Sequence, residues 1–227
     1  MAKKTHKSPE HAREVILDAA QKTVFEVGPA GLRISAVAKQ ANMAHPNIIH
    51  HFGSRQGLLN ALAKRVAERA TDRITIAISK AVQAAPEDRV LAMTQVLDTA
   101  YPGAEGKVAV WMHLSGAETS IKENMQRIVE FSHQLRTKID GDVNLENTNR
   151  LVMLVTLALV GEVISGPGIK DALGYGPEQA NRAHFRQWLA EILLNLSDSE
   201  LTTSLSNAAL ESGSNKKHHN NINSGHK

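Results

Sequence analysis

Between Arg33 and Leu58 the chain reads RISAVAKQANMAHPNIIHHFGSRQGL. Apolar and small residues recur at helical spacing on either side of Asn42, and this pattern predicts two short helices over residues 33–40 and 45–51. Asparagine is among the residues that best tolerate a positive φ, which a sharp turn between two helices requires. The stretch therefore predicts a helix-turn-helix, the arrangement that places its second helix in the major groove of DNA.

The flanking residues extend this unit to three helices followed by a long one. Residues 9–27 carry apolar side chains at three- and four-residue steps, and Gly28-Pro29-Ala30-Gly31 is expected to end that helix. Pro46 falls in the first turn of the second short helix, where its missing N–H costs little. Ser54 is a suitable N-cap for the long helix that follows.

Packing between the two short helices decides which side chains remain available to DNA. Val37, Ala38 and Ala41 are expected to face Ile48 and Phe52. The residues left facing outward are His45, Asn47, Ile49 and His50. These side chains suit base edges, because an asparagine pairs bidentately with adenine and an apolar side chain meets the thymine methyl group.

Phosphate contacts are expected from basic side chains around the turn and from N–H groups at the start of the long helix. The complete set of predicted DNA-binding residues is Arg33, Lys39, His45, Pro46, Asn47, Ile49, His50, His51, Ser54 and Arg55. Lys3, Lys4 and Lys7 form a short basic arm that would add non-specific affinity.

The charge distribution agrees with this interpretation. Residues 1–85 carry 13 Lys or Arg and 6 Asp or Glu, a net charge of +7. Residues 86–197 carry 10 and 14, a net charge of −4. A basic N-terminal part on an acidic body is typical of a protein that holds nucleic acid at one end.

Two other classes of function remain open. A helix-turn-helix can be a packing unit in a protein that acts through protein partners, or its basic surface can bind DNA without sequence preference. An all-helical enzyme is the other class. The single Glu130-Phe-Ser-His133 element does not make a di-iron site, which needs two such elements and two further glutamates. No zinc-protease, nucleophile-elbow or Walker motif occurs. We therefore expect no catalysis, no metal and no cofactor.

The remainder of the chain also has helical periodicity, so the predicted fold class is all-α. Helical stretches are expected near residues 87–100, 104–115, 119–139, 147–165 and 178–196, with a break from Gly166-Pro167-Gly168 to Pro177. The predicted domain organisation is a basic arm at 1–10, a DNA-binding domain at 11–60, a helical ligand-binding and dimerisation domain at 61–197, and a disordered polar tail at 198–227.

The N-terminal part resembles the TetR family of bacterial transcriptional regulators. The matching residues are Ile16-Leu-Asp-Ala-Ala20, Val24-Phe25, Gly28, Val37-Ala38, Ala41-Asn-Met-Ala44, Ile48 to Phe52, Ser54-Arg55 and Leu58-Leu59. The resemblance covers about residues 11–62 without gaps. It implies an N-terminal DNA-binding domain and a helical C-terminal domain that binds a small molecule and dimerises. The expected protein is thus a repressor that binds a palindromic operator as a homodimer and is released by a small-molecule effector.

The chain departs from the family pattern at several positions. The family usually has threonines where this chain has Leu32 and Arg33, and a glycine in the turn where this chain has Asn42. The family usually has a phosphate-contacting tyrosine at the position of Ile49, so Arg33, His50 and Arg55 would have to substitute for it. The run Ile48-Ile-His-His-Phe52 resembles the choline-pathway repressor branch, but it is too short to identify a ligand.

Two helices of the C-terminal part are expected to pair with their copies in a second chain. The helices near 147–165 and 178–196 are rich in large apolar residues, and four such helices can form a bundle around a two-fold axis. The alternative is that both belong to the core of one chain. A ligand cavity is expected among the middle helices, lined by Trp111, His113, Met125, Phe131, Met153 and Glu162.

The composition indicates a cytoplasmic protein. There are no cysteines, and the N-terminal residues carry positive charges without an apolar run behind them, so no secretory signal is expected. The longest apolar stretch, Leu151 to Ile164, contains Glu162 and is shorter than the about 20 residues that a membrane span needs. We therefore expect a buried helix there.

Overall fold

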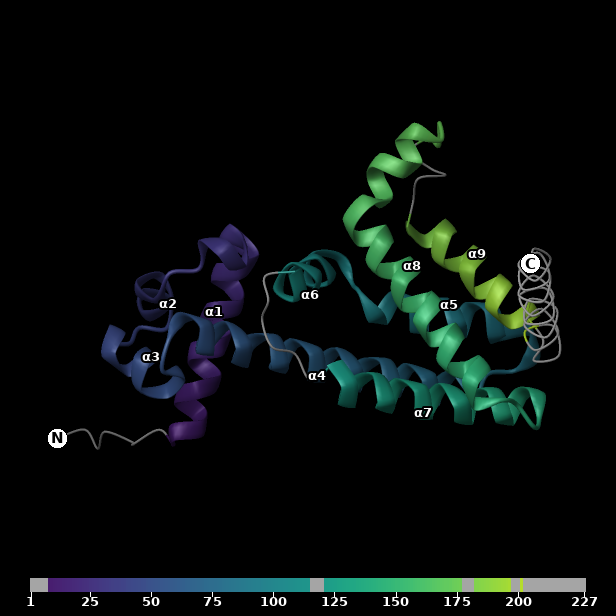
Figure 1. Cartoon of the computed structure of the whole chain (residues 1–227), viewed down its shortest axis with the longest axis horizontal. Coiled ribbons are helices and arrows are strands. Elements are labelled where there is room, and N and C mark those ends of the chain that lie inside the picture. Colours follow the sequence, from purple (N-terminus) through teal and green to yellow (C-terminus); the bar gives the residue numbers. More distant parts are fainter. Residues whose placement is uncertain (1–7, 115–120, 177–181, 197–200, 202–227) are drawn as a thin grey trace, which may run out of the picture.

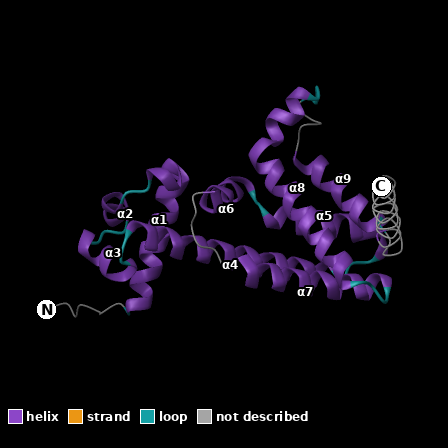
Figure 2. Cartoon of the chain, in the orientation of Figure 1, coloured by secondary structure: helices purple, strands orange, loops and turns teal. Residues whose placement is uncertain are grey.

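The computed structural model describes residues 8–114, 121–176, 182–196 and 201. Helices make up nearly all of this part, and no strand occurs in it (Figure 2), so the predicted all-α fold is confirmed. The helices are α1 (Pro9–Gly31), α2 (Ile34–Gln40), α3 (His45–Phe52), α4 (Arg55–Ala81), α5 (Arg89–Ala100), α6 (Gly103–Leu114), α7 (Ile121–Asp140), α8 (Leu145–Ala172) and α9 (Arg182–Asn195), with a short 3-10 turn at Pro86–Asp88. Lys3, Lys4 and Lys7 of the basic arm, and the polar tail apart from Leu201, lie outside the described residues.

The N-terminal lobe is a compact unit of α1, α2, α3 and the first turns of α4 (Figure 1). Its core consists of small and apolar side chains that are almost wholly excluded from solvent, among them Ile16, Ala20, Val24, Val37, Ile48, Leu58 and Leu62. The predicted end of the first helix is observed as a break, because Gly28 has φ 73° and ψ 168°. Pro29 then begins one further turn that ends at Gly31.

The long helix α4 joins this lobe to the rest of the molecule (Figure 1). Its first half belongs to the N-terminal core, and Ile78 and Ala81 near its end lie in a second apolar cluster with Val96 and Leu135. The domain boundary predicted between residues 60 and 61 therefore falls inside a continuous helix. Any displacement of one lobe against the other must act on this shared helix.

The C-terminal lobe is built from α5 to α9 packed around the far half of α4. Leu97 of α5, Leu159 of α8 and Leu189 of α9 meet in a third apolar cluster. Beside it, the buried Arg186 guanidinium donates to a Glu162 carboxylate oxygen at 3.0 Å and to the Leu97 carbonyl oxygen at 2.8 Å. An ion pair held by further hydrogen bonds in this way ties α5, α8 and α9 together.

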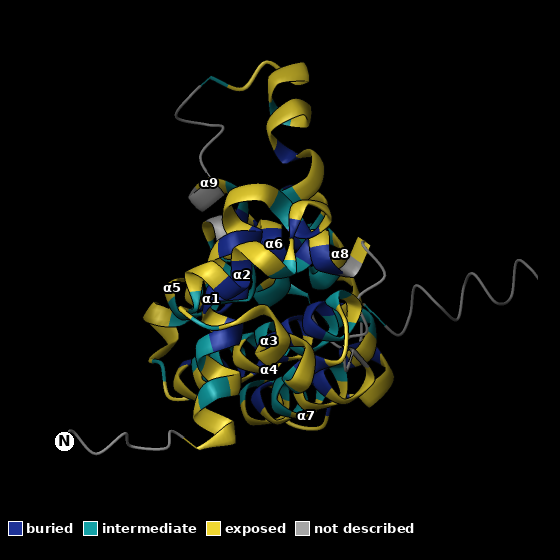
Figure 3. Ribbon diagram, turned by 90° about the vertical axis from the view of Figure 1, so that its left-hand side faces the viewer, coloured by how far each residue is buried: buried dark blue, intermediate teal, exposed yellow. Residues whose placement is uncertain are grey.

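Helix α8 differs from two expectations. It continues through Gly166-Pro167-Gly168 to Ala172, where a break was predicted. Proline removes only one N–H from the ladder, and the ion pair of 3.6 Å between Lys170 Nζ and Glu162 Oε1 spans the interrupted turns. The expected burial is also wrong for the single chain, because apolar side chains of α8 are exposed and its last turns project from the molecule (Figure 3). Among the described residues α8 is the one helix long and apolar enough to cross a membrane by length and composition.

Candidate DNA-binding face and ligand cavity

The turn between α2 and α3 has the geometry that the sequence predicted. Asn42 has φ 52°, the one positive value among the described non-glycine residues. Val37 and Ala38 of α2 and Ile48 and Phe52 of α3 are buried in one cluster. α3 is therefore held by its inner side against α2, and its outer side has no part in the core.

The outer side of α3 is exposed. His45, Pro46, Asn47, Ile49 and His50 all lie on the surface of the N-terminal lobe, and 38% of Ile49 is exposed. No Asp or Glu occurs between Glu26 and Glu68, so no carboxylate stands on α2, on α3 or on the turns around them. A surface free of carboxylates and carrying Arg33 and Lys39 is favourable for an approaching phosphate backbone.

Two of the predicted phosphate contacts have structural partners inside the lobe. Arg55 donates from Nε to the Leu32 carbonyl oxygen at 2.8 Å and from Nη2 to the carbonyl oxygens of Pro29 and Ala30 at 2.6 and 3.0 Å. It therefore binds the end of α1 to the start of α4. The Ser54 hydroxyl accepts from the Gly57 N–H at 3.0 Å, which confirms the predicted N-cap.

Other contacts that position α3 were not foreseen. Arg13 of α1 donates to the backbone carbonyl oxygen of His51, and its guanidinium carbon lies 4.4 Å from the centroid of the Phe52 ring. A Cβ on Gly57 would collide with the Phe52 carbonyl oxygen, so only glycine lets α4 begin this close to the end of α3. Each contact depends on how helices distant in the sequence meet, which periodicity does not reveal.

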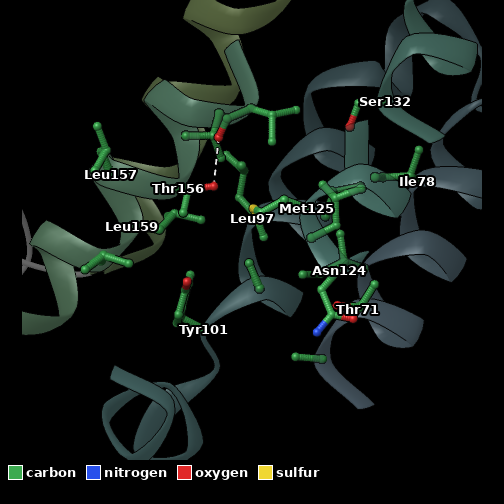
Figure 4. A pocket seen from close by; sticks show the side chains of 18 of the residues that line it. Thr71, Ile78, Leu97, Tyr101, Asn124, Met125, Ser132, Thr156, Leu157 and Leu159 are labelled. Carbon is green, nitrogen blue, oxygen red and sulfur yellow. Dashed lines mark hydrogen bonds between the residues drawn. The ribbon is translucent and has the colours of Figure 1, made fainter. Parts of the chain in front are cut away.

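The middle of the C-terminal lobe contains a cavity of about 450 Å³. Its walls come from α4 to α9, and most of the side chains are aliphatic (Figure 4). Tyr101, at the end of α5, is the one aromatic residue among the described lining residues. Burial raises the pKa of the Tyr101 hydroxyl above its ordinary value, so the group stays neutral.

The N-terminal lobe matches a known family model. Residues 16–62 fit the model of bacterial regulatory proteins of the tetR family, and these residues include α2, α3 and the turn between them. The chain belongs to the TetR family. The resemblance inferred from the sequence is thereby confirmed.

One curated relative extends the match beyond the N-terminal lobe of this TetR-family chain. A segment of 127 residues is 26% identical to the HTH-type transcriptional regulator BetI of Rhizobium meliloti (strain 1021). The segment covers 56% of this chain and 62% of the relative, so the chain spans less than two thirds of the length of that protein.

Solved structures share the fold of both lobes. A TetR-family protein of Mesorhizobium loti MAFF303099 has a TM-score of 0.60 at 13% identity, and the match covers 83% of this chain and 98% of that one. The multidrug binding protein EbrR, solved with imidazole, has a TM-score of 0.51 at 19% identity, covering 86% of this chain and 95% of that one. At these identities the likeness concerns the fold alone.

Within this TetR fold, the six residues predicted to line a cavity do not gather in one place. Met125 of α7 is on the cavity wall. Phe131 packs between α4 and α7 and lines a separate, smaller hollow. Met153 is an exposed residue of α8. The side chain of His113 lies outside the described residues.

The other two predicted ligand residues have structural neighbours of their own. The half-exposed Trp111 ring lies on α6, where its carbons are 3.8 Å from the position of a Cβ on Gly28, at the contact between the two lobes. Glu162 is buried in its ion pair with Arg186, away from the cavity. Neither residue lines the cavity in this structure, and each packs against a partner within the protein.

Two polar residues that were not among the predicted ligand residues do line the cavity, Tyr101 and Asn124. Tyr101 lies in the Tyr101-Pro102-Gly103 break between two expected helices, and Asn124 lies within the helix expected near residues 119–139. Asn124 is 5% exposed, and its amide faces the same space as Thr71 of α4 (Figure 4). A polar residue near the start of an expected helix does not by itself indicate that its side chain faces a cavity.

Proposed function

We propose that this TetR-family chain is a transcriptional repressor that binds a palindromic operator as a homodimer and is released by a small-molecule effector. The observation that carries the proposal is the outer side of α3. Ile48 and Phe52 on the inner side of α3 are buried, and the exposed residues on its outer side are of the types that read base edges. Because an operator is DNA inside the bacterial cell, we expect the protein to act in the cytoplasm.

The residues of the N-terminal lobe take different roles in this proposal. Asn47 reads a base through its amide, and Ile49 contacts a thymine methyl group or a sugar. The remaining base contacts come from His45 and His50, with Pro46 and His51 beside them. Phosphates are bound by Arg33 and Lys39, and Ser54 marks the N-terminus of α4, whose N–H groups face the backbone. Arg55 acts mainly by holding α1 and α4 in place, since three of its hydrogen bonds go to carbonyl oxygens.

The homodimer is supported by the apolar surface of α8 and α9. Met153, Leu154, Leu157 and Ile164 of α8 and Trp188 of α9 are each exposed in the single chain by 48–65%. Monomeric soluble proteins rarely leave such a continuous apolar patch open. The opposite side of α8 is held within the lobe by Glu162 and Arg186, so one side remains for the same helices of a second chain. This arrangement favours the dimer over the alternative of a core within one chain, and over a membrane span.

Release by an effector is supported by the position of α6 between cavity and DNA-binding lobe. Met112 of α6 lines the cavity and is also buried in the core that contains Ile48 and Leu62. A ligand that shifts α6 therefore changes the packing of the N-terminal lobe. Coupling of about 1–3 kcal/mol would lower operator affinity by roughly 5- to 150-fold. The structural neighbour EbrR, which was solved with imidazole, also holds a small molecule.

The test is binding of the purified full-length protein to DNA, measured by fluorescence anisotropy over a series of salt concentrations. One duplex comes from upstream of the gene itself, and the other is a scrambled sequence of the same length and composition. A preference of about a hundredfold or more for the upstream duplex supports a specific regulator. Equal weak binding that disappears as salt rises contradicts it, and would favour the alternative of a basic surface without base readout.

A further inference from the structure

The cavity of the C-terminal lobe is lined mainly by apolar side chains. Aliphatic side chains from α4, α5, α7 and α8 surround it, and among the described lining residues only Arg136 and Asp140 carry a formal charge. Both lie towards the end of α7, and Asp140 is its last residue. The central part of the cavity therefore offers apolar contacts and few polar ones.

The hydroxyl groups on the wall are largely used by the protein. The Thr71 hydroxyl donates to the Ala67 carbonyl oxygen at 2.9 Å, and the Thr156 hydroxyl donates to the Val152 carbonyl oxygen at 2.8 Å. At the α7–α8 contact the Thr148 hydroxyl accepts from Arg136 Nη1 at 2.8 Å. The two hydroxyls that donate within their own helices can still accept a hydrogen bond but have no hydrogen to give.

Asn124 differs from these hydroxyl groups, because its side chain has a donor that the protein does not use. The residue is only 5% exposed, and its amide nitrogen Nδ2 is buried and makes no hydrogen bond. Buried polar groups nearly always have a partner, so a donor left without one is a strong indication that something else supplies the acceptor. Figure 4 shows this amide beside Thr71.

We propose that the effector is a neutral, mainly aliphatic molecule with one hydroxyl or carbonyl group, and that Asn124 binds this polar group. The proposal rests on the proposed function for the role of the cavity as an effector site. The effector's oxygen accepts from Asn124 Nδ2, and a hydroxyl effector can also donate to the Thr71 oxygen. The aliphatic part occupies the space between α4, α5 and α8. A cavity of 450 Å³ lies within the size range of sites for such small molecules.

The same walls disfavour charged ligands. A cation in an apolar cavity needs carboxylates or several aromatic faces around it, and the described wall offers one carboxylate, Asp140 at the end of α7, and one aromatic side chain, Tyr101. An anion needs a basic partner, and the Arg136 guanidinium already donates to Thr148. A quaternary ammonium such as choline is therefore expected to bind poorly, in spite of the likeness to BetI.

The experiment uses probes that differ only in the head group. Decanol, decanoate and decyltrimethylammonium are titrated below their aggregation concentrations into the full-length protein, and binding is followed by calorimetry. We expect decanol to bind at least about tenfold more tightly than either charged probe. Tighter or equal binding of decanoate or of the ammonium compound overturns the proposal, and so does the absence of decanol binding.

Two variants test the role of Asn124. Asn124→Leu keeps the size of the side chain and removes the amide, and it should weaken decanol binding by about tenfold. Ser132→Ala removes another polar group from the wall on the same helix, and it should change decanol binding by less than about twofold. Equal affinity of Asn124→Leu and wild type overturns the assignment. If Asn124→Leu does not fold, the comparison of head groups on the wild-type protein still decides the ligand class.

Operator binding is measured on the same preparations without any probe. Specific DNA binding together with no preference for decanol would refute the ligand class and leave the proposed regulator intact. Loss of sequence preference in the probe-free protein would instead refute the proposed function. A fall in operator affinity when decanol is added supports both.

Discussion

The two lobes of the molecule differ in how completely their apolar side chains are packed within one chain. The N-terminal lobe has a continuous buried apolar core within one chain, and Arg65 donates to Glu14, Asp18 and Gln21 across the contact of α1 with α4. The C-terminal lobe has a cavity in its middle and an uncovered apolar face on α8. A lobe that must present a fixed surface is close-packed, whereas a lobe that must accept other molecules keeps apolar surface uncovered in the single chain.

The strongest test of this contrast is a core truncation in the N-terminal lobe. Leu62 is fully buried there, so Leu62→Ala should lower the free energy of unfolding by about 2–5 kcal/mol through lost contacts and a cavity. Leu91→Ala on α5, where the side chain is 60% exposed, should change it by less than about 0.5 kcal/mol. Urea unfolding followed by circular dichroism measures both, and equal effects would show that the N-terminal core is not close-packed.

The next test concerns the uncovered face of α8. Leu154→Arg places a charge at an exposed position outside the cavity lining, and it should convert the dimer to a monomer because a buried charge without a partner is costly. The matched control is Leu91→Arg on α5. Light scattering gives the mass, and operator affinity should fall by about a hundredfold or more for Leu154→Arg alone, since the second half-site is lost. A dimeric Leu154→Arg protein would place the interface elsewhere.

A variant of Arg55 tests whether hydrogen bonds within the N-terminal lobe stabilise the DNA-binding face. Arg55→Ala should lower the stability by about 1–3 kcal/mol, because three carbonyl oxygens lose their donors. Lys39→Ala, on the exposed side of α2, should leave the Tm unchanged and reduce the salt dependence of DNA binding by about one phosphate contact. Thermal unfolding of the two variants separates these roles. An unchanged Tm for Arg55→Ala would mean that Arg55 contributes to phosphate binding and not to the stability of the lobe.

The exposed side of α3 can be tested residue by residue. Asn47→Ala should relax the preference at one base pair by about 1–3 kcal/mol while other positions keep theirs. The measurement is operator affinity for a set of single-base variants of the duplex, with Lys39→Ala as the comparison that weakens all duplexes alike. If Asn47→Ala loses the same affinity for every duplex, Asn47 contacts the phosphate backbone and not a base.

The smallest effect concerns the wall of the cavity. Because burial raises the pKa of Tyr101 above its ordinary value of 10.0, the folded chain retains this proton longer than the unfolded chain does. Tyr101 therefore costs no stability below about pH 9, and stability is lost as the pH rises above 10 towards the folded pKa. Tyr101→Phe should be less sensitive to pH in this alkaline range. An identical pH profile of the two proteins would mean that the hydroxyl is well solvated.

Much of the fold was readable before the structure. Asn42 was expected to turn with positive φ, Ser54 to cap α4, and Ile48 and Phe52 to face α2, and each is observed. The expected break at Gly166-Pro167-Gly168 failed because an ion pair of Lys170 with Glu162 supports the helix across the proline. Glu162 and Trp111 were expected on the cavity wall but lie against Arg186 and Gly28, which are far away in the sequence.

The sequence by itself determined the helices, the helix-turn-helix and the family of the N-terminal lobe, because turns, caps and apolar spacing act within a few residues of chain. The tertiary structure alone decided what surrounds each side chain. Arg55 reaches carbonyls 23 to 26 residues earlier in the chain, and Asn124 of α7 comes beside Thr71 of α4. Such neighbours depend on where helices cross and on which volumes between them stay unfilled. A one-dimensional pattern does not contain that information.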